Sequence, residues 1–388
     1  MRDGRVKPIS KGNGRWLIRV CCGYDAQGKK RMASRQIRVD PNKSESAQLA
    51  EAYKETDRFR IELENRTATA GRQYTLKEYV PLWLDSYCVQ KGLEKGTVAG
   101  YENLLNGRIL PQLGKKKLRD IDAIQLNRFF AGLREEKLSG TYQRKYYNLL
   151  HRIFESAIQD DLLAVNPTKK IEPPKKDTKE HSVYNEEQVK QLVQALKDEE
   201  PKWRAFMLLA LDSQIRKGEC VGLNWSDIDM ERQTVSINRS CAYTKKDGQY
   251  LKAPKTSSGK RTIHVSPETL EALKAWKREQ GRQRLKMGVH WHDEQAVFTQ
   301  EDGKRMCVHS PTKWFPRFLK RHGLPSMNLH GLRHTGASLL IGNSMDIASV
   351  SHRLGHSRIS TTLDIYSHAY EEKDVGLTDA MSSFMYKE

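Results

Sequence analysis

The sequence predicts a multidomain protein with three parts: a small three-stranded β-sheet with one helix, an all-α bundle and an α+β domain. Short strand-like segments separated by turn residues continue to about residue 40. Helical periodicity follows from residue 75 to about 161, and a segment rich in Pro and Lys then precedes a mixture of helices and strands. We therefore expect domains at residues 1–70, 74–165 and 182–388, with a linker at 166–181 and a C-terminal tail in the last domain.

The charge of the chain indicates a polyanionic partner. Its 388 residues carry a formal net charge of +19 at pH 7, and nucleic acid is the commonest partner of such a protein. An anionic membrane surface is the alternative, but the sequence has no long cationic amphipathic helix and no apolar run that approaches about 18 residues. The first residues also lack the apolar core of a secretory signal. A cytoplasmic protein that binds no membrane is predicted.

The N-terminal segment predicts a basic sheet. Strand-like stretches at 6–11, 15–24 and 30–39 are separated by turn residues, and a helical pattern follows at 44–64. Through residue 40 there are 11 Lys and Arg against 3 Asp and Glu. A sheet of this kind can enter the major groove of DNA, although a merely solvated charged face is the alternative. The DNA-binding candidates here are Arg15, Arg19, Lys30, Arg31, Arg35 and Arg38.

The second segment predicts a helical bundle with a basic surface. Apolar stripes begin at Leu76 and at Tyr146 and recur at helical spacing, which indicates core. Basic side chains on the polar faces suit a bundle that grips phosphates. The DNA-binding candidates here are Lys95, Lys115, Lys116, Arg144 and Lys145.

The third segment holds polar residues suited to chemistry on phosphates. A capping box of Asn185 and Gln188 predicts a helix start. Arg216 follows an apolar helix, although an Arg in this place is more often a cap of helical carbonyls. Two short strands flank a turn at 257–259, which would place Lys255 near the tip of a hairpin, where lysines are normally just solvated.

No metal site is predicted. His330 and His334 are one helical turn apart, but the zinc protease motif needs Glu at the position that Gly331 occupies. The cysteines show no CxxC pair, so neither a zinc knuckle nor a disulfide framework is indicated, and free thiols are expected. They stand at positions 21, 22, 88, 220, 241 and 307.

Five short motifs occur in order in the third segment: RKGE at 216–219, PKT at 254–256, HGLRH at 330–334, LGHSRISTT at 354–362 and IYSH at 365–368. With them, the chain resembles the tyrosine recombinase (phage integrase) family, in particular integrases of conjugative transposons and temperate phages. The matching catalytic set is Arg216, Lys255, His330, Arg333, His356 and Tyr366. Two positions depart from the usual pattern: Ser213-Gln214 stands where Thr-Gly is usual, and Glu219 is Asp in some members.

The resemblance covers essentially the whole chain and implies its organisation. It implies an arm-binding N-terminal sheet, a helical core-binding domain and an α+β tyrosine recombinase catalytic domain. Double-stranded DNA with core-type and arm-type sites is the implied substrate, and a homotetramer is the implied synaptic complex. The resemblance also implies an excisionase and a host DNA-bending protein as partners, a bacterial mobile element as carrier, and neither metal nor other cofactor.

Cleavage of a phosphodiester without metal requires cations around the crowded phosphorus. Two guanidiniums, those of Arg216 and Arg333, can each offer paired donors to its oxygens. An attacking phenol needs a proton acceptor, for which His330 is suited, and the departing 5′ oxygen needs a proton, for which Lys255 is suited. The resemblance makes Tyr366 the nucleophile.

Two further residues have supporting roles. His356 suits a hydrogen bond to a phosphate oxygen, with Gly355 allowing the tight turn that points it into the site. Glu219 suits the orientation of the basic side chains, because a carboxylate beside a phosphate would repel it.

Two other classes of protein remain open. A type IB topoisomerase shares the chemistry but relaxes supercoils as a single clamp, and a DNA-binding regulator could use the same fold without catalysis. The separate N-terminal sheet favours recombination over the first, and the complete catalytic set counts against the second. The C-terminal tail after Glu371 has a near-helical apolar pattern, which predicts docking on a neighbouring protomer, with packing in cis as the alternative.

Overall fold

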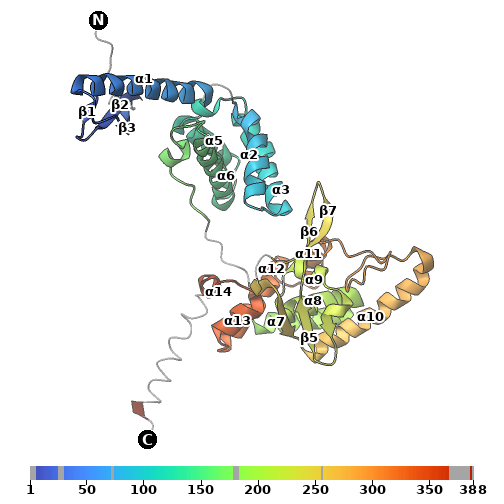
Figure 1. The fold of residues 1–388 in the computed structure, drawn as a ribbon. Coiled ribbons are helices and arrows are strands. Elements are labelled where there is room, and N and C mark those ends of the chain that lie inside the picture. The colour runs from blue at the N-terminus through green and yellow to red at the C-terminus, as the bar shows by residue number, and fades with distance from the viewer. Residues whose placement is uncertain are drawn as a thin grey trace. The chain divides into compact units, whose positions relative to one another are not determined.

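A computed structural model describes residues 6–24, 30–70, 74–177, 183–254, 257–366 and 385–386. For a few residues in strands and helices, Tyr366 among them, it describes the backbone only. The chain divides into two compact units, residues 1–178 and 179–388, and each is considered by itself (Figure 1). Most of the predicted C-terminal tail lies outside the described residues.

The first unit begins with a three-stranded antiparallel sheet and one long helix, as predicted. Trp16, Ile18 and Val20 alternate along the middle strand and are buried against the helix, together with its Phe59. The turn before this strand has positive φ at Gly12, Asn13 and Gly14, which suits its Gly-Asn-Gly sequence. The elements are β1 (Ile9–Ser10), β2 (Arg15–Tyr24), β3 (Lys30–Arg38) and α1 (Glu45–Ala70).

The rest of the first unit is the predicted helical bundle. The apolar stripes of its first and last long helices are buried, with Trp83, Tyr146 and Phe154 among the largest side chains of the core. Its helices are α2 (Leu76–Gln90), α3 (Lys95–Leu104), α4 (Leu110–Leu113), α5 (Ala123–Glu135) and α6 (Gly140–Gln159), with the π-helical turn η1 (Leu105–Ile109) and the 3-10 turns η2 (Leu118–Asp120) and η3 (Pro167–Lys170).

The segment 166–181 differs in part from the linker that its composition predicts. Thr168 and Ile171 are buried in the bundle. Farther along, the Asp177 carboxylate accepts hydrogen bonds of 3.1 Å from the backbone N–H groups of Gly140 and Thr141, at the start of α6. A Cβ on Gly140 would lie 2.1 Å from a carbonyl oxygen of this segment. Residues 166–177 therefore pack on the bundle, because a Pro-rich chain without periodicity can still bury side chains and cap a helix.

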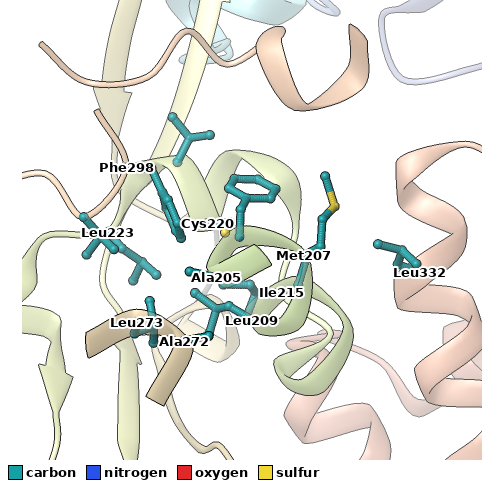
Figure 2. Packing of buried hydrophobic residues seen from close by; sticks show 14 of the residues in the cluster. Ala205, Met207, Leu209, Ile215, Cys220, Leu223, Ala272, Leu273, Phe298 and Leu332 are labelled. Carbon is teal, nitrogen blue, oxygen red and sulfur yellow. The ribbon is translucent and has the colours of Figure 1, made fainter. Parts of the chain in front are cut away.

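The second unit has an α+β fold, as predicted. Helix α8 (Pro201–Ser213) is at its centre and contacts α10 (Pro267–Met287) and α12 (Leu329–Gly342). Figure 2 shows part of this core, a cluster of buried side chains that includes Leu209 of α8, Leu273 of α10 and Cys220. The other helices are α7 (Glu186–Ala195), α9 (Lys217–Gly222), α11 (Ser310–Arg321), α13 (Ile347–Leu354) and α14 (Ile359–Tyr366), with the 3-10 turns η4 (Leu196–Asp198), η5 (Trp225–Asp227), η6 (Ser257–Gly259) and η7 (Gly288–His290).

Two small sheets complete the second unit, and they correct one prediction. The strands around 257–259 do not pair with each other: β7 pairs with β6, whereas β8 pairs with β5. The hairpin forms instead at Asp247-Gly248, where Gly248 has φ 70°. Lys255 thus belongs to a connection between two sheets and is itself outside the described residues. The strands are β4 (Ile228–Asp229), β5 (Thr234–Ile237), β6 (Ser240–Thr244), β7 (Gly248–Lys252) and β8 (Arg261–His264).

Three expectations from composition concern local features. The capping box at the start of α7 is present, with the Asn185 side chain accepting from the backbone N–H of Gln188 at 2.9 Å. The five cysteines whose side chains are described have free thiols. Among the helices of the described ranges, none has the length and apolar character needed to cross a membrane.

Candidate active site

Arg216 is placed by the junction between α8 and α9. Helix α8 ends at Ser213, Gln214 turns the chain with φ 51°, and Arg216 becomes the N-cap of α9. Glu219 closes this cap, because its carboxylate accepts from the Arg216 backbone N–H at 2.9 Å and from the Arg216 guanidinium at 2.9 Å. The RKGE motif thus starts α9 with a capping box. The same Glu219 carboxylate also fixes the Arg216 guanidinium.

Glu219 is shared by two arginines. The buried Arg261 of β8 donates to its second oxygen at 3.0 Å. Burial alone would raise the pKa of the Glu219 carboxyl, but the hydrogen bond and charge of Arg261, helped by Arg216, hold this pKa below its ordinary value. A buried carboxylate therefore orients the two cations, which is the role expected for Glu219.

Arg333 lies in the second turn of α12 and is buried. Its guanidinium donates to the carbonyl oxygens of Gln214 and Leu354, both at 2.7 Å, and to Nε2 of His356 at 2.9 Å. These bonds join the end of α8 to the end of α13 through one side chain. A cation with so many fixed partners is preorganised, so its charge is available without rearrangement.

His356 follows a left-handed turn at Gly355, which has φ 67° and ψ 41°. Since a guanidinium only donates, Nε2 of His356 accepts from Arg333, and Nδ1 is left to donate to the Thr362 hydroxyl at 2.9 Å. Burial, followed by the charges of Arg333 and Arg216, lowers the pKa of His356 to about 4. The imidazole is therefore neutral at pH 7, and its orientation is fixed from both ring nitrogens.

Two clefts adjoin these residues, and Arg216 lines both. The first has a volume of about 370 Å³ and is lined by Arg216, His330 and Arg333, so it gathers three of the predicted catalytic residues. The second has a volume of about 430 Å³ and is lined by Arg216, Glu219 and His356. His330 is exposed and its ring meets that of His334 edge to face, with centroids 4.7 Å apart.

Two predicted residues lie wholly or partly outside the described part of the chain. Lys255 lies outside the described residues, while its neighbour Pro254 lines the 430 Å³ cleft. Tyr366 is the last residue of α14, and its side chain is outside the described part. Helix α14 contacts α13, which ends directly before Gly355 and His356.

Three supporting residues escaped the sequence reasoning. Gln214 offers its carbonyl oxygen to Arg333, and Arg353 holds the Gln214 side chain with a bond of 2.7 Å from Nε to Oε1. Arg261 donates to the backbone oxygens of Arg353 and Gly259 at 2.8 and 3.2 Å. A basic residue at an inward position of the strand 261–264 is a signal that could have identified Arg261.

The predicted DNA-binding residues of the sheet fall into two groups. Arg15, Arg19 and Arg38 alternate with the buried residues and are exposed on the face opposite α1, where Arg15 and Arg38 are cross-strand partners. Arg35 instead pairs with buried Ile18, and its guanidinium lies 4.1 Å from the ring centroid of Phe59 in α1. The side chains of Lys30 and Arg31, both in β3, lie outside the described part.

The candidates of the bundle are mostly exposed. Lys145 lies over the ring of Tyr142 at 5.3 Å, and Arg144 is half-buried, donating to the carbonyl oxygen of Pro174 at 3.1 Å. Arg144 thus has a structural partner of its own. The exposed candidates are Lys95, Lys115, Lys116 and Lys145.

Comparison with known proteins agrees with this architecture. Residues 182–373 match the phage integrase family, and residues 75–134 match the N-terminal SAM-like domain of phage integrases. The chain is 27% identical over 392 residues to a XerC-like tyrosine recombinase of Caldanaerobacter subterraneus, covering 96% of this chain and 97% of that protein. It is 23% identical over 375 residues to the ICEBs1 integrase of Bacillus subtilis, covering 96% and 98% respectively.

A solved structure shows the same fold. The Tn1549 transposon integrase in complex with a circular intermediate DNA superposes with a TM-score of 0.64 at 20% identity, covering 78% of this chain and 99% of that one. One family match lies in the bundle. The other lies in the second unit and includes all the predicted catalytic residues. The chain therefore belongs to the phage integrase family, the tyrosine recombinases, and is a site-specific recombinase that cleaves and rejoins DNA to integrate and excise mobile DNA.

Proposed function

We propose that this recombinase cleaves each DNA strand by forming a covalent bond between the Tyr366 oxygen and the 3′ phosphate of the strand. The observation that carries the proposal is the network of Arg333, in which one buried guanidinium contacts the turn before Arg216 and also His356. This network supports a preformed cationic site next to the helix that ends at Tyr366.

The arginines act on the scissile phosphate. Arg216 and Arg333 donate to its non-bridging oxygens and stabilise the charge that grows on them in the five-coordinate transition state. Glu219 keeps Arg216 extended toward both clefts without contacting DNA, since its two oxygens are already engaged by Arg216 and Arg261. No part of this arrangement calls for a cofactor.

The covalent step exchanges one bond to phosphorus for another. The Tyr366 phenol oxygen attacks phosphorus, the bond from phosphorus to the 5′ oxygen breaks, and the phenol proton passes to His330. The 5′ oxygen takes a proton from Lys255 and leaves as a hydroxyl. The 3′ phosphotyrosine keeps the energy of the broken bond, so the 5′ hydroxyl of a partner strand reverses the step without ATP.

His356 responds to the arrival of the phosphate. In the free protein its Nε2 is an acceptor for Arg333. The monoanionic phosphodiester beside these groups offsets the charge of the arginines, which raises the pKa of His356 and allows Nε2 to carry a proton. Protonated His356 then donates a hydrogen bond to a phosphate oxygen.

The other domains hold the DNA. We assign arm-type sites to residues 1–70, whose open sheet face carries Arg15, Arg19 and Arg38, and core-type sites to the bundle at 74–165 with its exposed lysines. The λ integrase has been crystallised as a tetramer bound to a Holliday junction, which supports a homotetrameric synaptic complex here. An excisionase and a host DNA-bending protein would set direction, and the reaction would take place in the bacterial cytoplasm.

The test is covalent trapping on a nicked duplex that carries the end of the element, located by footprinting. In the presence of a chelator, the wild-type protein is expected to form a denaturant-resistant, protease-sensitive adduct, and Tyr366→Phe is expected to form none. An adduct in Tyr366→Phe would refute the assignment. Strand exchange between two duplexes is expected of the recombinase. Supercoil relaxation without strand exchange would indicate a topoisomerase. The absence of any adduct would indicate a regulator that binds DNA without catalysis.

A further inference from the structure

Lys217, the first residue of α9, lines the same 370 Å³ cleft as Arg216, His330 and Arg333. Its ammonium group donates to the Thr312 hydroxyl of α11 at 2.9 Å. Within the described ranges, no carboxylate lies within ion-pair distance of this ammonium. Lys217 therefore differs from Arg216, its neighbour in sequence, whose charge is balanced by Glu219.

The position of Lys217 is electrostatically unfavourable in the free protein. Its side chain is about half-buried, and burial lowers the pKa of the Lys217 ammonium, an effect that the Cys307 thiol only partly opposes. The same cleft contains two guanidiniums. A half-buried cation among other cations is stabilised by an anion that enters the cleft.

The hydrogen-bonding capacity of the pair fits a phosphate. An ammonium group has three donors, and its bond to Thr312 uses one. The Thr312 hydroxyl accepts that bond and retains its own proton for donation. Lysine binds phosphate as a compact charge, and a neighbouring hydroxyl donor fixes the position of one phosphate oxygen.

We propose that Lys217 and Thr312 form a binding subsite for a DNA backbone phosphate adjacent to the scissile one. The proposal rests on the proposed function, since the arginines of the same cleft are taken there to hold the scissile phosphate. The subsite binds the neighbouring phosphate whatever the base sequence, and it thereby sets the register of the strand against Tyr366. Lys217 is a positioning residue in this scheme, separate from the proton donor Lys255.

The first experiment measures binding and cleavage of the nicked duplex by four variants of the full chain. Lys217→Gln and Thr312→Val are expected to weaken binding, the first by about tenfold at low salt, and Lys217→Gln is expected to reduce the slope of log affinity against log salt by about 1. Lys217→Arg is expected to retain binding. Lys274→Gln is the matched control, because Lys274 is an exposed lysine of α10 paired with Glu271.

The second experiment removes the charge from the DNA and leaves the protein unaltered. Single methylphosphonate linkages are placed at each position beside the scissile phosphate. One of them is expected to weaken binding of the wild-type protein and of Lys274→Gln by about tenfold while leaving Lys217→Gln unaffected. Adduct formation by Lys217→Gln on the unmodified duplex shows that this variant is folded.

The outcomes separate the two proposals. If the wild-type protein forms no adduct, the proposed function fails. If it forms the adduct and no methylphosphonate position distinguishes it from Lys217→Gln, the subsite is refuted while the proposed function stands. An equal loss of DNA affinity in Lys274→Gln and Lys217→Gln would show that the effect comes from the net charge of the protein, and it would also refute the subsite.

Discussion

His356 shows how a neutral histidine can be built among arginines. Its Nε2 atom accepts from Arg333, and that bond requires the unprotonated nitrogen. Protonation in the free protein would remove this acceptor and place a fourth cation beside three others. Burial of the ring is the main cause of the low pKa of about 4, and the charge of Arg333, whose contact positions the ring, lowers the pKa further.

A pH dependence of stability follows from this pKa. An ordinary histidine takes up its proton near pH 6.5, as His356 does in the unfolded chain, whereas folded His356 does so only near pH 4. Between these values the unfolded state binds more protons, so the free energy of unfolding contributed by His356 falls as the pH is lowered from 6.5 to 4.

The measurement is urea unfolding of the wild-type protein and His356→Asn between pH 4 and 7. The stability of the wild-type protein relative to the variant is expected to decrease toward low pH. A difference independent of pH would contradict the assigned protonation state. Addition of the cognate duplex is expected to raise the pKa of His356, which the chemical shift of its imidazole reports.

Gln214 holds a backbone conformation that usually belongs to glycine. Its φ is 51°, and its side chain passes so close to Gly336 of α12 that a Cβ there would lie 2.8 Å from the Gln214 Cγ. The usual Thr-Gly of the family is replaced here by Ser213-Gln214, and the bond from Arg353 fixes the larger side chain. Gln214 and Gly336 are therefore coupled.

The coupling predicts a non-additive pair of substitutions. Gly336→Ala is expected to lower the free energy of unfolding by about 1–3 kcal/mol, because Gln214 and the backbone around Leu211 must move. In a Gln214→Gly background the same change is expected to cost less, as urea unfolding would show. Gly342→Ala, where no neighbour lies within 4 Å of a new Cβ, is the control. Strictly additive effects would contradict the coupling.

At the scale of elements, Glu219 joins α9 to β8. The carboxylate closes the cap of α9 and pairs with the buried Arg261, so its loss affects both a helix start and a strand. Arg261 also holds Gly259, four residues after Lys255. The Glu219 carboxylate therefore fixes the Arg216 guanidinium directly. Through Arg261 it also fixes Gly259, near the proposed proton donor Lys255.

Glu219→Gln is expected to lower the free energy of unfolding by about 3 kcal/mol, because it leaves a buried guanidinium without its counter-charge. Adduct formation on the nicked duplex is expected to fall by about tenfold or more, since Arg216 loses its fixed orientation. Glu271→Gln, which breaks an exposed pair with Lys274, is expected to change stability by less than about 0.5 kcal/mol. Equal effects of the two variants would argue against the bridge.

The sequence predicts elements better than their pairing. The apolar stripes and the capping box lie within single segments, so periodicity and spacing suffice to locate them. The pairing of β7 differs from the prediction, because Ser257-Ser258-Gly259 resembles a hairpin turn but Asp247-Gly248 is the stronger hairpin signal. Weighting Asp-Gly above Ser-Gly would have placed β7 against β6.

At the scale of the whole molecule, the charge of +19 is distributed over surfaces with different roles. The open face of the N-terminal sheet carries Arg15, Arg19 and Arg38, and Arg35 packs on α1 instead. Arg35 is also exposed, but its guanidinium packs on the Phe59 ring, so we expect the first group to contact phosphates. The salt dependence of DNA binding can therefore distinguish a face that binds DNA from charge that is merely present.

Replacing Arg15, Arg19 and Arg38 with Gln is expected to reduce affinity for arm-type DNA and to lower the slope of log affinity against log salt by about 3. The cleavage of a nicked core-type duplex is expected to change little, because the proposed catalytic residues lie in the second unit. The control is Arg35→Gln, which is expected to reduce the stability of the sheet through the loss of its contact with Phe59 and to leave the slope unchanged. A lower slope in Arg35→Gln and an unchanged slope in the triple variant would show that DNA binds the face of the sheet that carries Arg35.

The catalytic set could be proposed from sequence because its members lie in short motifs of fixed order. Its supporting contacts could not, since they join residues far apart in the chain: Arg353 meets Gln214 across 139 positions and Arg261 meets the Arg353 carbonyl across 92. Arg35 and Arg144 show the same limit for surfaces, because a basic residue in a basic segment can be engaged by an aromatic ring or a carbonyl.

Arg216 is common to both clefts, and this has a pharmacological consequence. A small organic anion lodged in the 430 Å³ cleft beside Arg216 and His356 would compete with the scissile phosphate for the guanidinium that we propose holds it. Such a compound could block mobilisation of the element without mimicking DNA and without occupying the cleft that contains Lys217. Because the cleft walls include the turn at Gly355, resistance by simple enlargement of that residue would also damage the enzyme.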